Sequence, residues 1–381
     1  MDLRSLASGR HARKCFTLIA MMASTTLNCG RVGFASEAAI VDAANDEWWN
    51  EDWNTRQQLT FLNSTDEHLI DVPVYVALDQ AALHIDTAAT NLRIVAADGS
   101  LLPFEIEAIR SGLVHVWVKV PQISPRSRTE YMWAYADSAV TNGVADRNAP
   151  WSDAFGLVMH MTGQARDSAL QNSVVVDASG GTVDGKIAGA LQFNGLSQYL
   201  RIADQPGLHA VTGLVITAWI RSLRTTPPNF YPAVINRQSA AGSFYDDFSI
   251  AQDVDSLVRL SCAIGETQTS AKEFKLTTDS GLDKWHAVAI VIDANSLVAS
   301  SFLDGEFVNS VGLTARTESN RPIWIGASTN SANDSVPNVE FLQGLVDEVR
   351  VHRVVRSASW LKADYLIQTQ QFVRYGVIER R

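Results

Sequence analysis

An aspartate in the segment 344–353, GLVDEVRVHR, stands where a strand pattern predicts an apolar residue. Alternate positions place Leu345, Val349 and Val351 on one face, and Asp347 falls on that same face. A carboxylate that faces a core is costly unless it is paired, hydrogen-bonded or bound to a metal. Two interpretations stay open. In the first, Asp347 is a calcium ligand, because calcium binds carboxylate and carbonyl oxygens. In the second, it accepts hydrogen bonds from backbone N–H groups at the end of the strand.

The connection 224–248, RTTPPNFYPAVINRQSAAGSFYDDF, contains side chains that suit a sugar. Aromatic rings can stack on sugar faces, and polar groups on loops can hydrogen-bond to hydroxyls. The candidate ligand-binding residues are Asn229, Phe230, Tyr231, Arg237, Tyr245, Asp246 and Asp247. The alternative is that these aromatic side chains pack over the edge of the fold. Trp48, Trp49 and Trp53 present the same choice, and we interpret them as anchors of the opening strand.

The sequence lacks the signatures of common catalytic sites. The eight histidines are scattered, and no two of them stand at metal-ligand spacing. There is no G-x-S-x-G motif, and GGTVDGKI departs from a phosphate loop at Ile187, where Ser or Thr is needed. Glu105 and Glu107 share a strand face that we expect to be solvated, so they do not suggest the facing carboxylates of a glycosidase. We therefore predict that the chain is not an enzyme.

Short strands separated by turn residues must position these groups. Segments such as RQQLTFLN, DVPVYVAL and LVHVWVKVP predict a first all-β sandwich over residues 47–140. The polar stretch 141–152 contains Pro150 and predicts a linker, and a second strand-rich run over 153–381 predicts another sandwich. Near its end, SASWLKADYLIQTQ predicts a helix with Ser357 as the N-cap, and FVRYGVIE predicts a last strand. The fold class is therefore all-β, with two antiparallel sandwiches and a short C-terminal helix.

The first 35 residues have the order of a secretory signal peptide: a basic segment, a short apolar run, and a cleavage site after Ala35. A lipoprotein signal at Cys29 is the alternative. Residues 36–46 are small and polar and predict a flexible leader. Cleavage would remove five basic groups and one acidic group, so the formal charge would change from -10 to -14. An acidic chain argues against nucleic acid as a partner. Beyond the signal only Cys262 remains, so no intrachain disulfide is expected.

The second sandwich resembles LamG-type, concanavalin A-like jelly rolls. The residues that carry the resemblance are LVMHMTGQARDSALQNS (157–173), IAGALQFNGLSQYLRI (187–202), GLVITAWIRS (213–222), KWHAVAIVID (284–293) and LQGLVDEVRVHR (342–353). The first sandwich resembles a bacterial domain of unknown function that often precedes LamG modules, through WWNEDWNTRQQLTF and NLRIVAADGSLLPFEIE.

The resemblance implies an exported protein of the periplasm or the cell surface, with no transmembrane segment in the mature chain. Calcium sites recur in such jelly rolls, and their first and last strands are commonly neighbours, so Asp167 and Asp347 are the expected pair of structural calcium ligands. Two functions follow. One is non-catalytic recognition of a glycan through the LamG-like domain. The other is an interaction with an envelope protein of a TolQ/ExbB-type proton-driven transport complex. The jelly-roll glycosidases carry an E-x-D-x-x-E strand, which this sequence lacks.

Overall fold

The computed structural model describes residues 47–381, apart from 141, 164, 170–174, 179, 211, 225–230, 244, 254–259, 277–282, 317 and 333–334. The expected signal peptide and leader lie outside the described residues. Residues Trp49–Arg381 form one compact unit. No helix in the described part of the chain is long and apolar enough to cross a membrane.

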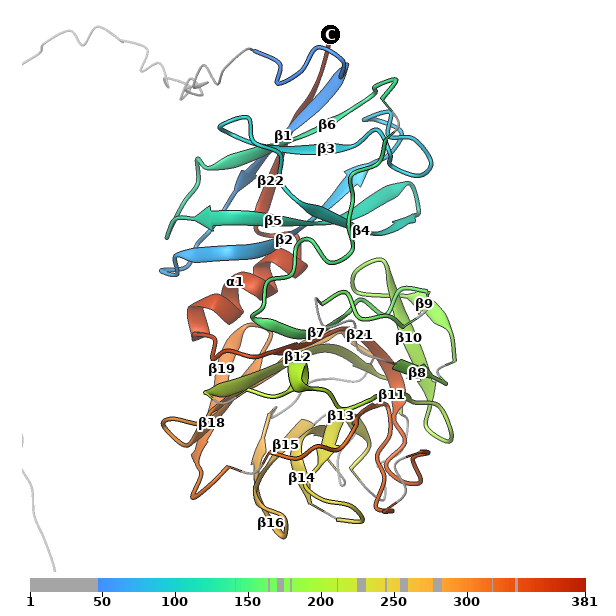
Figure 1. Cartoon of the computed structure of the whole chain (residues 1–381), viewed down its shortest axis with the longest axis vertical. Helices are drawn as coiled ribbons and strands as arrows, with labels where there is room; N and C mark the ends of the chain where they lie inside the picture. The colour runs from blue at the N-terminus through green and yellow to red at the C-terminus, as the bar shows by residue number, and fades with distance from the viewer. Residues whose placement is uncertain are drawn as a thin grey trace, which may run out of the picture. The chain divides into compact units, whose positions relative to one another are not determined.

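Seven antiparallel strands build the first sandwich, in two sheets with the orders β22-β1-β6-β3 and β2-β5-β4 (Figure 1). The long strands β2 and β5 pair from Leu69–Ile123 to Asp79–Leu113, as their alternating apolar residues require. Side chains such as Val74, Val116 and Met132 fill the core between the sheets. The strands are β1 (Thr55–Phe61), β2 (Leu69–Asp79), β3 (Arg93–Ala96), β4 (Phe104–Arg110), β5 (Leu113–Ile123), β6 (Tyr131–Ala136) and β22 (Val373–Arg380).

The second sandwich packs an eight-stranded sheet against a seven-stranded sheet. The first has the order β19-β18-β17-β12-β21-β10-β9, with β7 also paired to β21, and the second has the order β16-β15-β14-β13-β20-β11-β8. The strands of the eight-stranded sheet are β7 (Phe155–Met159), β9 (Thr182–Asp184), β10 (Gly189–Asn194), β12 (Gly213–Ser222), β17 (His286–Asp293), β18 (Val298–Leu303), β19 (Glu306–Gly312) and β21 (Gln343–His352). Those of the seven-stranded sheet are β8 (Val175–Asp177), β11 (Leu200–Ile202), β13 (Ala233–Gln238), β14 (Asp246–Gln252), β15 (Leu260–Thr267), β16 (Ser270–Lys275) and β20 (Ile323–Ile325). A 3-10 turn, η1 (Pro206–Leu208), precedes β12.

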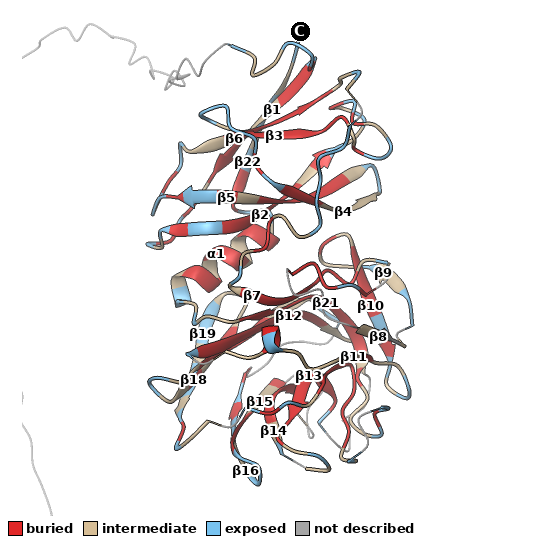
Figure 2. Cartoon of the chain, viewed as in Figure 1, coloured by how far each residue is buried: buried red, intermediate tan, exposed pale blue. Residues whose placement is uncertain are grey.

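The two central strands of the eight-stranded sheet, β12 and β21, are buried on both faces over nearly their whole length (Figure 2). On β12, Leu214 and Ile216 face the core between the two sheets. Val215 faces the opposite way and belongs to the apolar cluster of the first sandwich. The outer face of this sheet is therefore covered, which explains why GLVITAWIRS reads as a nearly continuous apolar run rather than an alternation.

Helix α1 (Ala358–Gln368) supplies part of that cover (Figure 1). The hydroxyl of Ser357 accepts a hydrogen bond from the backbone N–H of Trp360 at 3.0 Å, which confirms the predicted N-cap. Trp360, Leu361 and Ile367 point from the helix into the apolar cluster that includes the first sandwich. The helix is therefore held by packing on both sides.

The last strand, β22, belongs to the first sandwich. Its position within residues 153–381 had predicted that it belongs to the jelly roll. It pairs with β1 from Arg380–Thr55 to Val373–Phe61. The hydroxyl of Tyr375 accepts a hydrogen bond from the backbone N–H of Ala77 at 2.9 Å. Helix α1 carries the chain back to this sheet, and an isolated strand pattern cannot show which sheet edge it joins. The linker at 141–152 stays a prediction.

We expect deletion of residues 372–381 to destabilise the first sandwich. The deletion removes the strand that pairs with β1 and takes Phe372 and Val373 out of the core, and loss of a buried phenylalanine alone costs about 3–5 kcal/mol. Urea denaturation followed by tryptophan fluorescence measures the change, with deletion of Arg381 alone as the control. Unfolding of the shortened chain at the wild-type urea concentration would contradict the pairing.

Candidate functional site

A β-bulge in β21 sets the positions of its charged residues. Trp219 of β12 pairs with Asp347, whereas Thr217, two residues earlier, pairs with Arg350, so β21 contains one extra residue. Glu348 lies at the irregularity and has a φ of 48°. A bulge of this kind bends the strand and redirects the side chains that follow it.

The bulge changes which face of the strand Asp347 occupies. Val346, before the bulge, and Val349, after it, both belong to the core between the two sheets. Asp347 points to the outer side, where its pairing partner Trp219 stacks on Tyr365 of α1 with ring centroids 5.7 Å apart. The expectation that Asp347 shares an apolar face with Val349 is therefore wrong, because one inserted residue reverses a period of two.

Asp347 is nevertheless fully buried, and three backbone N–H groups hold its carboxyl group. The N–H groups of Lys186 and Ile187 donate to Oδ2 at 2.8 and 2.9 Å, and that of Glu348 donates to Oδ1 at 2.8 Å. Burial, together with the charge of Glu348, raises the pKa of Asp347 well above its ordinary value. The arrangement is the one that the backbone interpretation describes.

The other expected metal ligand, Asp167, has a similar environment. Its Oδ1 accepts the backbone N–H groups of Val158 at 3.0 Å and Ala169 at 2.8 Å. Within the described residues, neither Asp167 nor Asp347 belongs to a group of three or more side chains whose metal-ligating atoms converge. The contacts found for both carboxylates are thus typical of structural aspartates that order a turn.

The one convergent group of this kind in the described part of the chain surrounds His160 instead. His160 follows β7, and its Nδ1 lies 2.7 Å from Oε1 of Glu348 and 3.6 Å from Oε2 of Glu107. Its Nε2 lies 3.2 Å from Oε2 of Glu105. The imidazole is therefore enclosed by carboxylates from β4 of the first sandwich and β21 of the second.

The two glutamates of β4 are held by further donors. Each side chain accepts one indole N–H and one hydroxyl, so its oxygens are oriented toward His160 by neighbours on both sides. The donors are Trp151 (2.7 Å) and Ser168 (2.7 Å) to Glu105, and Trp117 (2.9 Å) and Thr162 (2.8 Å) to Glu107.

A buried arginine, Arg350, completes the charged cluster. Its NH2 lies 2.5 Å from Oε2 of Glu348, and its NH1 lies 3.0 Å from Oδ1 of Asp364. The guanidinium also lies over the rings of Trp117 at 4.3 Å and Trp151 at 5.1 Å. A fully buried guanidinium requires such pairing, and stacking on indole faces adds attraction.

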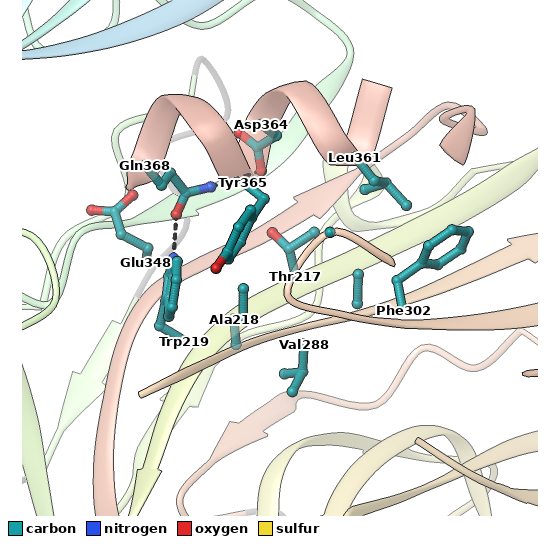
Figure 3. A pocket seen from close by; sticks show the side chains of 13 residues that line it. Thr217, Ala218, Trp219, Val288, Phe302, Glu348, Leu361, Asp364, Tyr365 and Gln368 are labelled. Carbon is teal, nitrogen blue, oxygen red and sulfur yellow. Dashed lines mark hydrogen bonds between the residues drawn. The ribbon is translucent and has the colours of Figure 1, made fainter. Parts of the chain in front are cut away.

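Helix α1 extends the cluster to β12. Figure 3 shows Asp364 and Gln368 on the face of the helix that looks toward Trp219. Nε2 of Gln368 donates to Oδ2 of Asp364 at 2.7 Å, and the indole N–H of Trp219 donates to Oε1 of Gln368 at 2.6 Å. The same residues line a small pocket between the helix and the sheet, which Thr217 and Glu348 also line.

Negative charge exceeds positive charge in this cluster, and the pKa values respond to it. Burial raises the pKa of Glu107 to about 7, with a further rise from the charge of Glu348. Burial opposes a charged imidazole, yet the carboxylates of Glu348, Glu105 and Glu107 together raise the pKa of His160 well above its ordinary value. The four carboxyl groups are Glu105, Glu107, Glu348 and Asp364, against Arg350 and His160.

The sequence pattern does not predict this cluster. It predicts a solvated face for Glu105 and Glu107, but their side chains are only 4% and 1% exposed, because residues that follow β7 cover β4. A usable signal was present: His160, Glu348 and Arg350 are ionisable residues inside or beside otherwise apolar strand patterns. What no pattern could show is that two sandwiches bring them together.

A second candidate site lies on the outer face of the seven-stranded sheet and includes part of the expected sugar-binding loop. Tyr231 and Tyr245 are exposed at 37% and 43% and line a pocket with Asp246 and Glu340. Small side chains on β14 and β15 also line it: Ser249, Ala251, Ser261 and Ala263. Their strand neighbours Phe248, Ile250, Cys262 and Ile264 face the core, as the period of two requires.

The carboxyl groups of this pocket resist ionisation. Burial and the nearby charge of Glu340 raise the pKa of Asp246 well above its ordinary value. Burial raises the pKa of Glu340 to about 7. A carboxyl group that stays protonated can both donate and accept hydrogen bonds, as a hydroxyl ligand needs.

The remaining expected ligand-binding residues divide into two groups. Arg237 and Asp247 are fully buried and pair with each other at 2.6 Å, with a further hydrogen bond from Arg237 to the carbonyl of Leu208. This pair anchors the base of the loop and does not face the pocket that Tyr231 and Tyr245 line. Asn229 and Phe230 lie outside the described residues.

We expect Asp347→Ala to lower the free energy of unfolding. The substitution leaves three buried backbone N–H groups without their acceptor, and each unsatisfied donor costs about 1–3 kcal/mol. Chemical denaturation measures the change, and Asp184→Ala, at a side chain that is 92% exposed, is the control. The melting temperature of the wild type should not depend on calcium. A rise with calcium that disappears in Asp347→Ala would instead establish the calcium interpretation.

We also expect Glu107→Gln to change how stability depends on pH. Because the folded-state pKa of Glu107 is raised from 4.5 to about 7, its contribution to stability is complete below pH 4.5 and is lost as the pH rises through 7. The stability difference between wild type and Glu107→Gln should therefore fall by roughly 1–3 kcal/mol across this range. Denaturation in the presence of a chelator measures it, with the exposed Glu51→Gln as the control. A difference that is constant with pH would contradict the raised pKa.

Part of the chain matches the model of a known superfamily. Residues 194–362 match the model of the concanavalin A-like lectin/glucanases superfamily. No curated protein is significantly similar to the chain.

Several solved structures are similar to it in part. They include the binding domain of Paraclostridial Mosquitocidal Protein 1 (11% identity, TM-score 0.45, 56% of this chain and 52% of that chain). They also include the botulinum neurotoxin serotype D binding domain (12%, 0.44, 56% and 51%) and the binding domain of botulinum neurotoxin DC in complex with SialylT (11%, 0.44, 57% and 52%). The chain thus spans about half of the length of these structures. On the family match, which confirms the resemblance seen in its sequence, the second sandwich contains a concanavalin A-like domain at residues 194–362.

Proposed function

We propose that the chain is an exported, non-catalytic protein that binds carbohydrate through the pocket on the outer face of the seven-stranded sheet. The observation that carries the proposal is the pair of exposed tyrosines, Tyr231 and Tyr245, beside two carboxyl groups of raised pKa, Asp246 and Glu340. The superfamily of this domain, which includes lectins, supports the same substrate class.

The architecture favours this face over the other. The outer face of the eight-stranded sheet is covered by α1 and the first sandwich, as the burial of Val215 and Val291 in their cluster shows. The seven-stranded sheet instead carries a pocket with small residues at its base and aromatic rings at its edge. Small residues let a sugar ring approach the strands, tyrosine faces can stack on its C–H groups, and carboxyl and hydroxyl groups can bond to its hydroxyls.

We expect Tyr231→Ala and Tyr245→Ala each to weaken glycan binding by about tenfold or more, because each removes one stacking surface from the pocket. A glycan array, read with and without calcium, identifies a ligand, and titration calorimetry then measures its affinity. Phe307→Ala is the matched control, since Phe307 is 57% exposed but lies on β19 of the other sheet.

Three results would contradict the proposal. The first is a glycan that binds with equal affinity to the wild type and to both tyrosine variants. The second is the absence of any bound glycan on a broad array. The third is release of reducing ends from a bound polysaccharide, which would show catalysis and would direct attention to Asp246 and Glu340 as the paired carboxyl groups.

A further inference from the structure

The side chains around His160 bring three atoms that can bind a metal close together. The Nδ1 of His160 lies 2.7 Å from Oε1 of Glu348 and 3.6 Å from Oε2 of Glu107, and the three ligand atoms all lie within 4.8 Å of one another. Ligand atoms that share one Zn²⁺ at 2.0–2.1 Å are separated by roughly 3–3.5 Å. Shifts of up to about 1 Å would bring these atoms onto one ion.

Each of the three side chains has a further hydrogen-bond or ion-pair partner within the cluster. The Nε2 of His160 faces Glu105 at 3.2 Å, which leaves Nδ1 as the nitrogen that can bind a metal. Oε2 of Glu348 is held by Arg350 at 2.5 Å. Oε1 of Glu107 accepts a hydrogen bond from Thr162, and Oε2, the oxygen nearer His160, accepts one from the indole N–H of Trp117. A carboxylate on the distal nitrogen of a ligating histidine, with hydrogen-bonded carboxylate ligands, is the usual outer shell of a metal site in proteins.

The net charge of the cluster and its access from a cavity both suit a divalent metal ion. The four carboxyl groups of the cluster face one permanent cation, Arg350, so a divalent ion would offset the excess negative charge. Glu107, His160 and Thr162 also line a cavity of about 240 Å³, which leaves room for a water ligand and for entry. Arg147 and Arg166 line the same cavity, so an anion could share the outer position of the ion.

We propose that Glu107, His160 and Glu348 bind one divalent transition-metal ion, with Zn²⁺ as the first candidate, and that this ion links the two sandwiches. An imidazole with two carboxylates is a ligand set that Zn²⁺, Mn²⁺ and Co²⁺ accept, whereas Ca²⁺ takes oxygen ligands. Glu107 comes from the first sandwich, and His160 and Glu348 come from the second. Binding therefore stabilises the junction between them. The site is separate from the sugar pocket, so neither proposal depends on the other.

The test uses the full chain without its leader, stripped with a chelator and dialysed against ZnCl2, MnCl2, CoCl2 or CaCl2. We expect one Zn²⁺ per chain by elemental analysis, a higher melting temperature with Zn²⁺ and no change with CaCl2. His160→Gln and Glu348→Gln should lose the bound ion. Glu105→Gln, which removes the carboxylate charge behind His160 and one of its acceptor oxygens, should weaken binding by roughly 10–100-fold.

Two controls make the result decisive. His115→Gln changes another buried histidine, which bonds to Tyr75 in the first sandwich, and should keep one Zn²⁺ per chain. If His160→Gln fails to fold, the visible spectrum of Co²⁺ bound to the wild type still reports a nitrogen ligand. The bound metal can then be measured in Glu107→Gln, which changes the ligand that lines the cavity. The proposal is overturned if the folded wild type binds none of the three transition metals. It is equally overturned if the folded His160→Gln and Glu107→Gln variants retain full stoichiometry.

Discussion

The burial of Arg350 is the constraint on which the junction of the two sandwiches depends. Its guanidinium is fully buried, and a buried charge of this kind is tolerated only when its partners are complete. Glu348 comes from its own strand, Asp364 from helix α1, and the ring of Trp117 from the first sandwich. Three separate parts of the chain must therefore dock correctly before the charge of this side chain is paired. Breaking the set by removing one partner would leave an unpaired charge in the interior.

Strand β21 connects this junction to the concanavalin A-like domain. Its inner face contributes Val346, Val349 and Val351 to the core between the sheets, while its outer face carries the charged cluster. The bulge at Glu348 makes both roles compatible, because one extra residue lets valines before and after it face the same core. A residue with positive φ at this point is unusual for glutamate, and its two ion-paired oxygens hold it there.

The two candidate sites lie on opposite sides of the jelly roll and differ in chemistry. The junction cluster is enclosed and strongly charged, with a histidine among carboxylates. The pocket of the seven-stranded sheet is partly exposed, with tyrosines, hydroxyls and carboxyl groups of raised pKa. The first arrangement suits an ion that holds two domains together, and the second suits a neutral polyhydroxyl ligand.

The sequence by itself determined the strand-rich composition of both sandwiches, the concanavalin A-like pattern, the helix with its Ser357 cap, and the burial of Asp347. Each of these follows from local periodicity or from the type of a single residue, and both can be read from the sequence. Tertiary structure alone decided the rest. The bulge moved Asp347 to the other face, β22 joined the first sandwich, and covering residues buried Glu105 and Glu107. The charged cluster was also decided by tertiary structure. Its members stand up to 259 positions apart, from Glu105 to Asp364, and only docking of the sandwiches brings them within hydrogen-bonding distance.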